Sequence, residues 1–219
     1  GDKKLAIGLS FVNDKVFIEK QAFVALDFSY ELNLNESLNL HMGLKVGGNN
    51  YQVNTQGLQT YNVEQDPSLE PISRFNPNVG IGFYLKHEDY FISLSTPKML
   101  NTERAKNEDE YATVATDRAH FYLAGGYLFK INETLDLKPT MLVRYVNGAP
   151  FSTDFTANAI INQGFTFGLT YRTDESFAAL AHIKITKNFF LGYAYEYSLR
   201  SELLGRVNGS NELFLQYKF

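Results

Sequence analysis

The sequence predicts an all-β fold: a transmembrane antiparallel up-and-down β-barrel of twelve strands, forming a single domain over residues 1–219. Three observations lead to this prediction. Apolar and polar residues alternate in segments of about ten residues, the connections between these segments alternate between short and long, and the apolar rows carry no charge. Strands of that length, tilted by about 40°, cross the apolar band of an outer-membrane barrel, which is roughly 25 Å tall.

Period-2 alternation marks the strands in order along the chain. The composition agrees, because the chain contains 14 Tyr, 18 Phe and 16 Gly, and aromatic residues favour strands. A short helix is an alternative to β-structure only in the charged stretch TERAKNEDEY. We expect strands at residues 3–12, 21–33, 38–47, 78–86, 89–95, 118–131, 135–145, 154–162, 164–172, 176–185, 189–199 and 210–219.

The apolar rows justify these strands, because each row takes every second position and excludes charge. A charged side chain facing lipid costs roughly 2–4 kcal/mol at the membrane midplane, which gives the exclusion a physical reason. In chain order the rows are Leu5, Ile7, Leu9, Phe11; Val24, Leu26, Phe28, Tyr30, Leu32; Leu38, Leu40, Met42, Leu44, Val46; Phe121, Leu123, Gly125, Tyr127, Phe129, Ile131; Leu135, Leu137, Pro139, Met141, Val143, Tyr145; Phe165, Phe167, Leu169, Tyr171; Phe177, Ala179, Ala181, Ile183, Ile185; Phe189, Leu191, Tyr193, Tyr195, Tyr197; and Leu213, Leu215, Tyr217, Phe219. The opposite positions hold Asp27, Glu31, His41, Lys45, Lys86, His120, Lys130, Asp136, Lys138, Arg144, Arg172, His182, Lys184, Glu196 and Lys218.

The connections fit an up-and-down meander that has short turns at one end and long loops at the other. NLNES, HED, NET, NQ and TKN are short and rich in turn residues. The long pieces are NDKVFIEK, residues 48–77, residues 96–117, VNGAPFST and RSELLGRVNG, and only TDE blurs the alternation. Transmembrane barrels have short periplasmic turns and longer extracellular loops.

A soluble β-sandwich or a lipocalin-like barrel is the alternative fold, since its strands also alternate. A soluble barrel places its apolar side chains inside, and twelve strands enclose more space than one apolar core fills. The tail NELFLQYKF ends an apolar row on Phe219, like the last strand that outer-membrane barrels present to their insertion machinery. Outward aromatic residues at both strand ends, such as Tyr171 and Tyr217, fit two interfacial girdles.

Composition narrows the function further. The net charge of −4 argues against nucleic-acid binding, which needs a basic face. Cysteine is absent, so disulfides and thiolate chemistry are excluded. The sequence contains no apolar run of about 18 residues, the length of a transmembrane helix, and no signal peptide.

Several stretches together resemble the PorP/SprF family of outer-membrane proteins of Bacteroidetes. They include LAIGLSFVNDK, PNVGIGFYL, FISLSTPKML and NELFLQYKF, and the most specific are LKPTMLVRYVNGAP at 137–150 and GYAYEY at 192–197. The resemblance covers most of the chain and is weakest in the two long loops. Members of this family usually begin with an Asn-Pro-rich segment that this sequence lacks. We therefore expect an N-terminal hairpin before residue 1 and fourteen strands in the complete barrel.

The resemblance implies a component of the type IX secretion system, the export route of surface adhesins and gliding-motility proteins. It implies a location in the outer membrane of a Gram-negative, Bacteroidetes-type bacterium. The implied partners are the C-terminal region of a secreted adhesin, periplasmic and lipoprotein components of the machinery, and outer-membrane lipid, without nucleic acid.

No constellation of residues indicates an enzyme, a cofactor site or a metal site. The four His residues are scattered, with no His-Glu-x-x-His spacing, although His41, His120 and His182 share one strand face. No Gly-x-Ser-x-Gly elbow is present, and KVGGNN lacks the spacing of a phosphate loop. We therefore expect no catalytic residue, no cofactor and no bound metal.

Two functional hypotheses remain. In the first, the loops 48–77 and 96–117 bind a secreted adhesin through the aromatic residues Tyr51, Tyr61 and Tyr111, since Tyr is enriched at interface hot spots. In the second, the barrel is a passive porin or small-solute channel, for which 48–77 would be the inserted loop. Large side chains at the opposite positions, such as Tyr84 and Phe214, favour a filled interior and the first hypothesis.

A ring of lysines is the second candidate site. These lysines share the non-lipid parity and lie close to the short turns or to a terminus, so we expect them at the periplasmic mouth. Such a ring needs counter-charges or an acidic ligand, and the alternative is that each lysine is simply hydrated. The residues are Lys4, Lys86, Lys130, Lys138, Lys184 and Lys218.

Overall fold

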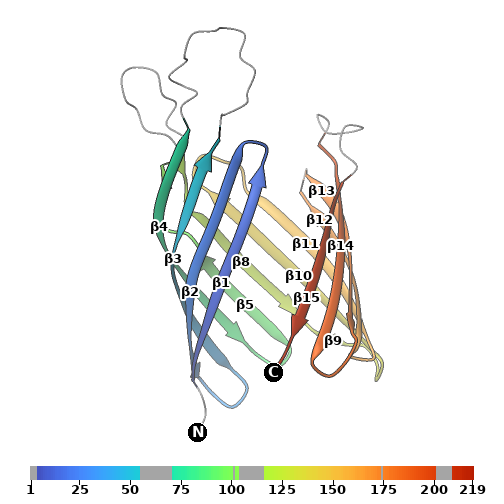
Figure 1. The fold of residues 1–219 in the computed structure, drawn as a ribbon. Helices are drawn as coiled ribbons and strands as arrows, with labels where there is room; N and C mark the ends of the chain where they lie inside the picture. Colours follow the sequence, from blue (N-terminus) through green and yellow to red (C-terminus); the bar gives the residue numbers. More distant parts are fainter. Residues whose placement is uncertain (1–3, 55–70, 101, 104–115, 174, 201–208) are drawn as a thin grey trace. The chain divides into compact units, whose positions relative to one another are not determined.

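The computed structural model describes residues 4–54, 71–100, 102–103, 116–173, 175–200 and 209–219 (Figure 1). Within these ranges the regular structure is entirely β. No helix there is long and apolar enough to pass through a membrane. The strands are β1 (Leu5–Val16), β2 (Glu19–Asn33), β3 (Asn39–Val53), β4 (Ile72–Lys86), β5 (Tyr90–Thr96), β6 (Thr102–Glu103), β7 (Thr116–Asp117), β8 (His120–Tyr127), β9 (Phe129–Lys130), β10 (Leu135–Val146), β11 (Ser152–Ile161), β12 (Phe165–Arg172), β13 (Ser176–Lys184), β14 (Phe189–Ser198) and β15 (Ser210–Tyr217).

The main sheet follows the chain order of an up-and-down meander. Its path is β1-β2-β3-β4-β5-β8-β10-β11-β12-β13-β14-β15, an open path on which β9 pairs with β10. The strands β6 and β7 form a separate two-stranded sheet. The registers of β1 to β3 and of β10 to β15 are antiparallel. The antiparallel all-β prediction is confirmed, and the twelve strands on the path correspond to the twelve expected ones, except that the strand expected at 118–131 is divided into β8 and the short β9.

The chain divides into two compact units, each of which is described by itself. Unit 1 comprises residues 1–84, 95–121 and 146–148, and unit 2 comprises residues 85–94, 122–145 and 149–219. The assignment of the whole chain to a single domain, and of two further strands before residue 1, stays a prediction.

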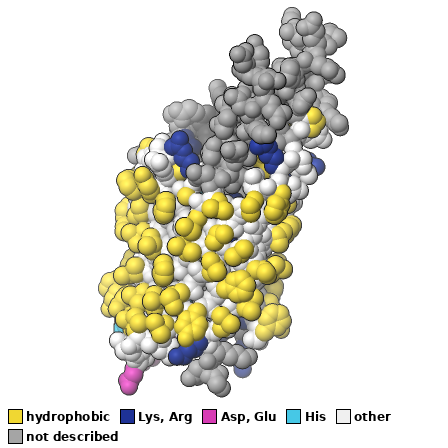
Figure 2. Space-filling model, turned by 90° about the vertical axis from the view of Figure 1, so that its left-hand side faces the viewer, with side chains coloured by type: hydrophobic (Ala, Val, Ile, Leu, Met, Phe, Trp, Pro, Cys, Tyr) yellow, Lys and Arg dark blue, Asp and Glu magenta, His cyan; other side chains and the backbone are white. Residues whose placement is uncertain are grey.

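Each unit has an apolar face that is exposed rather than packed. Leu9 and Ile7 of unit 1 are 73% and 68% exposed, and Leu215 of unit 2 is 59% exposed. Hydrophobic side chains cover the face seen in Figure 2, and Lys and Arg side chains lie towards its two ends. Among the described residues, the buried apolar side chains are those of Phe23, Ala25 and Tyr51 alone. A soluble sandwich would bury its apolar rows in a core, so this distribution is that of rows facing lipid.

Several strands extend further than the sequence predicts. The connection expected at 13–20 is a tight hairpin, because β1 and β2 stay paired to Val16↔Glu19 and Phe17 adopts a left-handed φ of 53°. Likewise, β3 continues to Val53 and β4 begins at Ile72, which shortens the loop expected at 48–77. The apolar period ends where a strand leaves the membrane band, but backbone hydrogen bonding continues beyond it. The apolar period therefore underestimates the length of these strands.

Three of the short turns share one construction. The turns at 34–38, 131–135 and 185–189 have the sequences LNESL, INETL and ITKNF. In the second, the amides of Ile131 and Asn132 both donate to the carbonyl of Leu135, at 3.0 and 3.2 Å. The Oδ1 atom of Asn132 accepts hydrogen bonds from the amides of Thr134 and Leu135, both at 2.9 Å. Short polar side chains that bond to the backbone two or three residues on favour such turns.

Candidate functional site

The long-loop end of unit 2 carries a set of ion pairs on its polar face, the face opposite the apolar rows. At its centre is Asp154 of β11, which is 8% exposed. Arg172 of β12 donates to both of its carboxylate oxygens, with Nε–Oδ1 at 2.8 Å and Nη2–Oδ2 at 3.2 Å. Nη2 of Arg144, on β10, lies 3.5 Å from the same Oδ1. A bidentate guanidinium–carboxylate pair is among the strongest charge-assisted contacts.

The ion pairs continue across the neighbouring strands. Arg172 Nη1 donates to Glu196 Oε1 of β14 at 3.0 Å. Glu175 Oε2 lies 3.9 Å from Arg172 Nε and 3.3 Å from Arg200 Nη2. Three guanidinium groups thus face three carboxylates, so the set is neutral and ties β10, β11, β12 and β14 together. We call Arg144, Asp154, Arg172, Glu175, Glu196 and Arg200 the rim network.

Backbone hydrogen bonds hold the connections next to the rim network. The amide of Thr173 donates to the carbonyl of Thr153 at 2.9 Å, and the amide of Leu199 donates to the carbonyl of Glu175 at 2.7 Å. The hydroxyl of Thr173 accepts from the amide of Thr153 at 3.1 Å. The positions from which the connections leave this end of unit 2 are therefore fixed.

In unit 1, Asn78 of β4 performs a similar task. Its side chain is buried, at 3% exposure. Nδ2 donates to the carbonyl of Leu100 at 2.9 Å, and Oδ1 accepts from the amide of Leu100 at 3.2 Å. The backbone of Pro97 passes so close to Gly80 that a Cβ atom there would collide with it. The segment 97–100 is therefore clamped against β4 at the point where the chain leaves β5.

The polar face of unit 1 also contains a neutralised charge in mid-strand. Lys45 Nζ lies 2.5 Å from Asp27 Oδ1 and donates to Ser10 Oγ at 2.8 Å, and the Ser10 hydroxyl donates to Asp27. The register places Asp27 directly opposite Lys45. Asp27 and Lys45 are thus paired with one another, as charged side chains shielded from lipid can be.

The expected aromatic anchors fall into two groups. Tyr51 lies inside β3, opposite Gln21, and is 4% exposed, so its ring is not presented on a loop. Tyr61 and Tyr111 lie outside the described residues, as does most of the stretch in which a short helix competed. Of that stretch, Thr102 and Glu103 form strand β6. The role of the three tyrosines in partner binding stays a prediction.

The expected lysine ring is divided between the units, with Lys4 in unit 1 and the other five in unit 2. Three of the five have individual partners at the turn end. Lys130 Nζ lies 3.6 Å from Asp89 Oδ1, Lys138 Nζ lies 5.0 Å from the centre of the Phe91 ring, and Lys218 Nζ lies 4.8 Å from that of Phe190. Like charges are thus accommodated by one carboxylate and by aromatic faces.

Two histidines of the polar face take aromatic partners. His41 lies against Tyr84, with ring centres 5.9 Å apart, and His182 stacks on Phe190 at 5.6 Å and 7°. Within the described part of the chain, no group of three His, Cys, Asp or Glu residues is arranged to hold a metal ion.

Sequence reasoning missed the rim network. Strand alternation places Arg144, Arg172 and Glu196 on the polar face, but it does not single out Asp154. Their meeting depends on register, since Asp154 is paired with Arg172 across β11–β12 and lies opposite Leu142, next to Arg144, across β10–β11. The available signal is that each of these charges lies within two residues of the long-loop end of its strand.

Comparisons with known proteins identify the family. The family model of the type IX secretion system membrane protein PorP/SprF matches residues 1–217. In fold, the chain is similar to the crystal structure of the Ralstonia pickettii toluene transporter TbuX, with a TM-score of 0.54 and 11% identity, covering 100% of this chain and 79% of that one. Among curated proteins the chain has no match. Family and fold point to the outer membrane, and the chain belongs to the PorP/SprF family of type IX secretion system membrane proteins.

Proposed function

We propose that this protein is an outer-membrane component of the type IX secretion system that assists the export or surface anchoring of a secreted adhesin. Its extracellular connections bind the C-terminal region of the adhesin, and its turn end meets periplasmic and lipoprotein components of the machinery. Its role is binding rather than catalysis, without cofactor or metal. The family match supports the coarse assignment, and the architecture of the long-loop end supports the finer one.

The fixed strand ends from which the long connections leave carry this proposal: the rim network holds them in unit 2, and Asn78 holds one of them in unit 1. Loops that only shield a barrel do not need rigid points of attachment. A docking surface, in contrast, gains affinity when its loops leave a rigid base, because less conformational entropy is lost on binding. Asp154, Arg172 and Glu196 supply such a base in unit 2. In unit 1, Asn78 clamps residues 97–100, immediately before the connection that contains Tyr111. The connection between β3 and β4, which contains Tyr61, is the second docking segment.

Solute transport is the competing function. The similarity to TbuX, at 11% identity, concerns the fold alone. No feature of the described residues favours a solute path over partner binding, and the paired charges of the polar face account for one another without a solute.

Deleting residues 55–70 tests the proposal, because the deletion spares both β3 and β4. We expect the adhesin to be lost from the cell surface while the barrel still assembles, as judged by heat-modifiable migration on a gel. The matched control replaces 55–70 by a Gly/Ser sequence of equal length, which keeps the loop length and removes its side chains. We expect this control to lose the adhesin as well. Surface retention that survives both changes would refute binding through this connection.

A further inference from the structure

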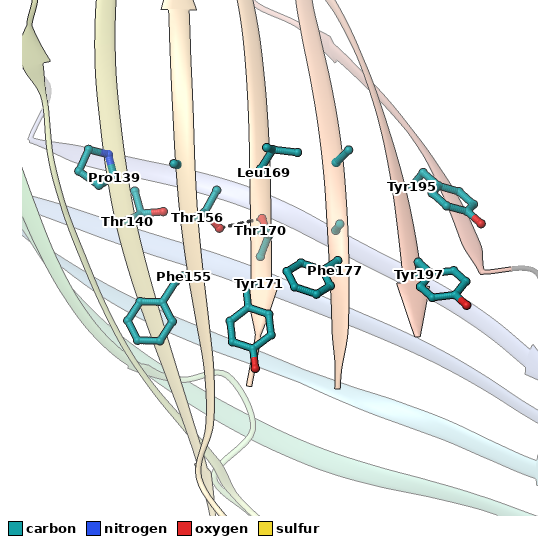
Figure 3. A pocket seen from close by; sticks show the side chains of 13 residues that line it. Pro139, Thr140, Phe155, Thr156, Leu169, Thr170, Tyr171, Phe177, Tyr195 and Tyr197 are labelled. Atoms are coloured by element: carbon teal, nitrogen blue, oxygen red, sulfur yellow. Dashed lines mark hydrogen bonds between the residues drawn. The ribbon is translucent and has the colours of Figure 1, made fainter. Parts of the chain in front are cut away.

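The apolar face of unit 2 contains a hollow of about 560 Å³ over strands β10 to β14 (Figure 3). It lies among the side chains that face lipid in the PorP/SprF fold, not on the polar face that carries the rim network. The proposed export function makes no use of it.

Alanines on two strands create the hollow. Ala157 of β11 and Ala179 of β13 both lie directly opposite Leu169 of β12. The side chain of Leu169 therefore stands between two positions where the face drops to the level of a Cβ atom. The next pairs towards the turn end repeat the arrangement, with Ala159 and Ala181 on either side of Phe167.

An aromatic wall closes the hollow on the long-loop side. Phe155, Tyr171 and Phe177 lie next to one another across β11, β12 and β13, and Figure 3 shows the three rings in a row. The rings of Tyr171 and Phe177 are 4.9 Å apart. Outward aromatic side chains at a strand end form the girdle at the headgroup level of a barrel. The alanine pair lies two residues further along each strand, about 6.7 Å along the strand and, at a tilt of about 40°, roughly 5 Å deeper in the hydrocarbon.

The hollow offers little polar surface to a ligand, because its side-chain polar groups are only the hydroxyls of Thr140, Thr156 and Thr170 and of Tyr171, Tyr195 and Tyr197. Thr156 and Thr170 alternate with the apolar row, and their hydroxyls bond to each other at 2.8 Å, drawn as the dashed line in Figure 3. The surface that an occupant meets is therefore almost entirely apolar, which argues against a solute or a charged peptide. This matches the charge-free rows on all sides, which place the hollow within the surface that contacts the membrane.

The width of the hollow decides between a lipid chain and a protein segment. Neighbouring strands lie about 4.8 Å apart, so the two strands on either side of an alanine-bearing strand are about 10 Å apart. The free width between their side chains is smaller than this, because the side chains occupy part of it. A transmembrane helix with its side chains is about 10–12 Å across, too wide to enter. An extended acyl chain is narrower than a helix and entirely apolar, and acyl chains are abundant in a membrane.

We propose that the hollow binds one acyl chain of a membrane lipid from the leaflet on the long-loop side, under the girdle of Phe155, Tyr171 and Phe177. The chain lies beside Leu169, against Ala157 and Ala179, and fills space that would otherwise leave the surrounding side chains without packing partners. Lipids that contact the rest of the apolar face have no such binding site and exchange more rapidly.

Tryptophan fluorescence tests this directly, because the chain has no Trp. Met141→Trp places a reporter on β10 opposite Phe155, beside the hollow. Val46→Trp places a reference on the apolar face of unit 1, at a position that is 45% exposed. Each full-length variant is titrated in detergent with a phospholipid whose acyl chains are brominated and quench Trp on contact. We expect half-maximal quenching of the Met141→Trp reporter at a several-fold lower mole fraction of brominated lipid than that of the reference.

Filling the hollow provides the decisive second arm. Adding Ala157→Leu and Ala179→Leu to each variant should move the reporter's curve onto the reference curve and leave the reference unchanged. Heat-modifiable migration checks that all four proteins assemble. Coincident curves before filling, or a reporter curve that filling does not shift, would overturn the proposal. So would a doubled mass by light scattering together with a protected reporter, since a second copy would then cover the hollow.

Discussion

The two ends of unit 2 are stabilised by different chemistry. At the turn end, Asn132 accepts hydrogen bonds from the amides of Thr134 and Leu135, and the hydroxyl of Thr186 accepts from the amide of Phe189 at 3.0 Å. At the long-loop end, Asp154 and Arg172 join separate strands across the sheet. A turn of a few residues holds two strands together by its own backbone, whereas a long connection does not. At the long-loop end, ion pairs between charged side chains therefore join the strands that the connection itself does not hold together.

This contrast also separates two uses of charge. The rim network is buried at its centre and neutral within itself. The lysines at the turn end are more exposed, as Lys130 is at 66%, and they rest on Asp89 or on aromatic rings. Buried charges that have lost a partner are strongly destabilising, while exposed pairs contribute little. Substitutions at the two ends should therefore differ in size.

The largest effect is expected from Asp154→Ala. It removes the shared carboxylate of Arg172 and Arg144 and leaves both guanidinium groups without their central counter-charge. We expect the free energy of unfolding to fall by about 3–5 kcal/mol, as when one partner of a buried pair is removed. Urea unfolding in detergent, followed by circular dichroism, measures this. Glu133→Ala, an exposed carboxylate in a short turn, is the matched control, and an equal loss in both variants would end the distinction between the two ends.

A charge placed between the two ends tests the faces instead. Leu123 of β8 is on the apolar face and is 47% exposed, and Ala124 is the next residue on the polar face. We expect Leu123→Arg to block assembly, because a lipid-facing Arg costs roughly 2–4 kcal/mol near the midplane. Ala124→Arg should be better tolerated. The yield of heat-modifiable protein in outer membranes compares the two, and similar yields would contradict the assignment of faces.

A smaller effect is expected from Asn132→Ala at the turn end. The change leaves two backbone amides without their side-chain acceptor, but water can reach this exposed turn. We expect a loss of about 1 kcal/mol, the net value of a typical hydrogen bond. Asn132→Thr, which copies the residue at the same place in the turn at 185–189, should restore part of the stability. A loss as large as that of Asp154→Ala would show that the turn also depends on its side chains for strand pairing.

The smallest effect on stability is expected from replacing Lys130, Lys184 and Lys218 together by Gln. All three residues are exposed, so the free energy of unfolding should change by less than about 0.5 kcal/mol. Pull-down of periplasmic components from solubilised membranes is the second readout. If these lysines bind an acidic partner segment, capture falls while the barrel still assembles. Unchanged capture would leave them as hydrated side chains at the turn end.

Local sequence determined most of the fold. The rows from Leu5 to Phe11 and from Leu213 to Phe219 identify strands and their lipid-facing sides, because a strand's side chains alternate and lipid excludes charge. The turns LNESL and INETL are equally predictable from the sequence, since the Asn side chain accepts hydrogen bonds from nearby backbone amides. These features act over a few residues, so no knowledge of distant neighbours is needed. The resemblance to PorP/SprF likewise rested on short stretches, and the family match confirms it.

Only the tertiary structure decided which side chains meet across strands. Whether Asp154 meets Arg172 or another cation depends on register, and a shift by one residue would turn either side chain to the other face. The lengths of β1 and β3, the burial of Tyr51 and the hollow between Ala157 and Ala179 depend in the same way on pairing beyond the apolar period. Alternation along one strand contains no information about its neighbour's register. That information comes from hydrogen bonds and side-chain contacts between residues far apart in the chain.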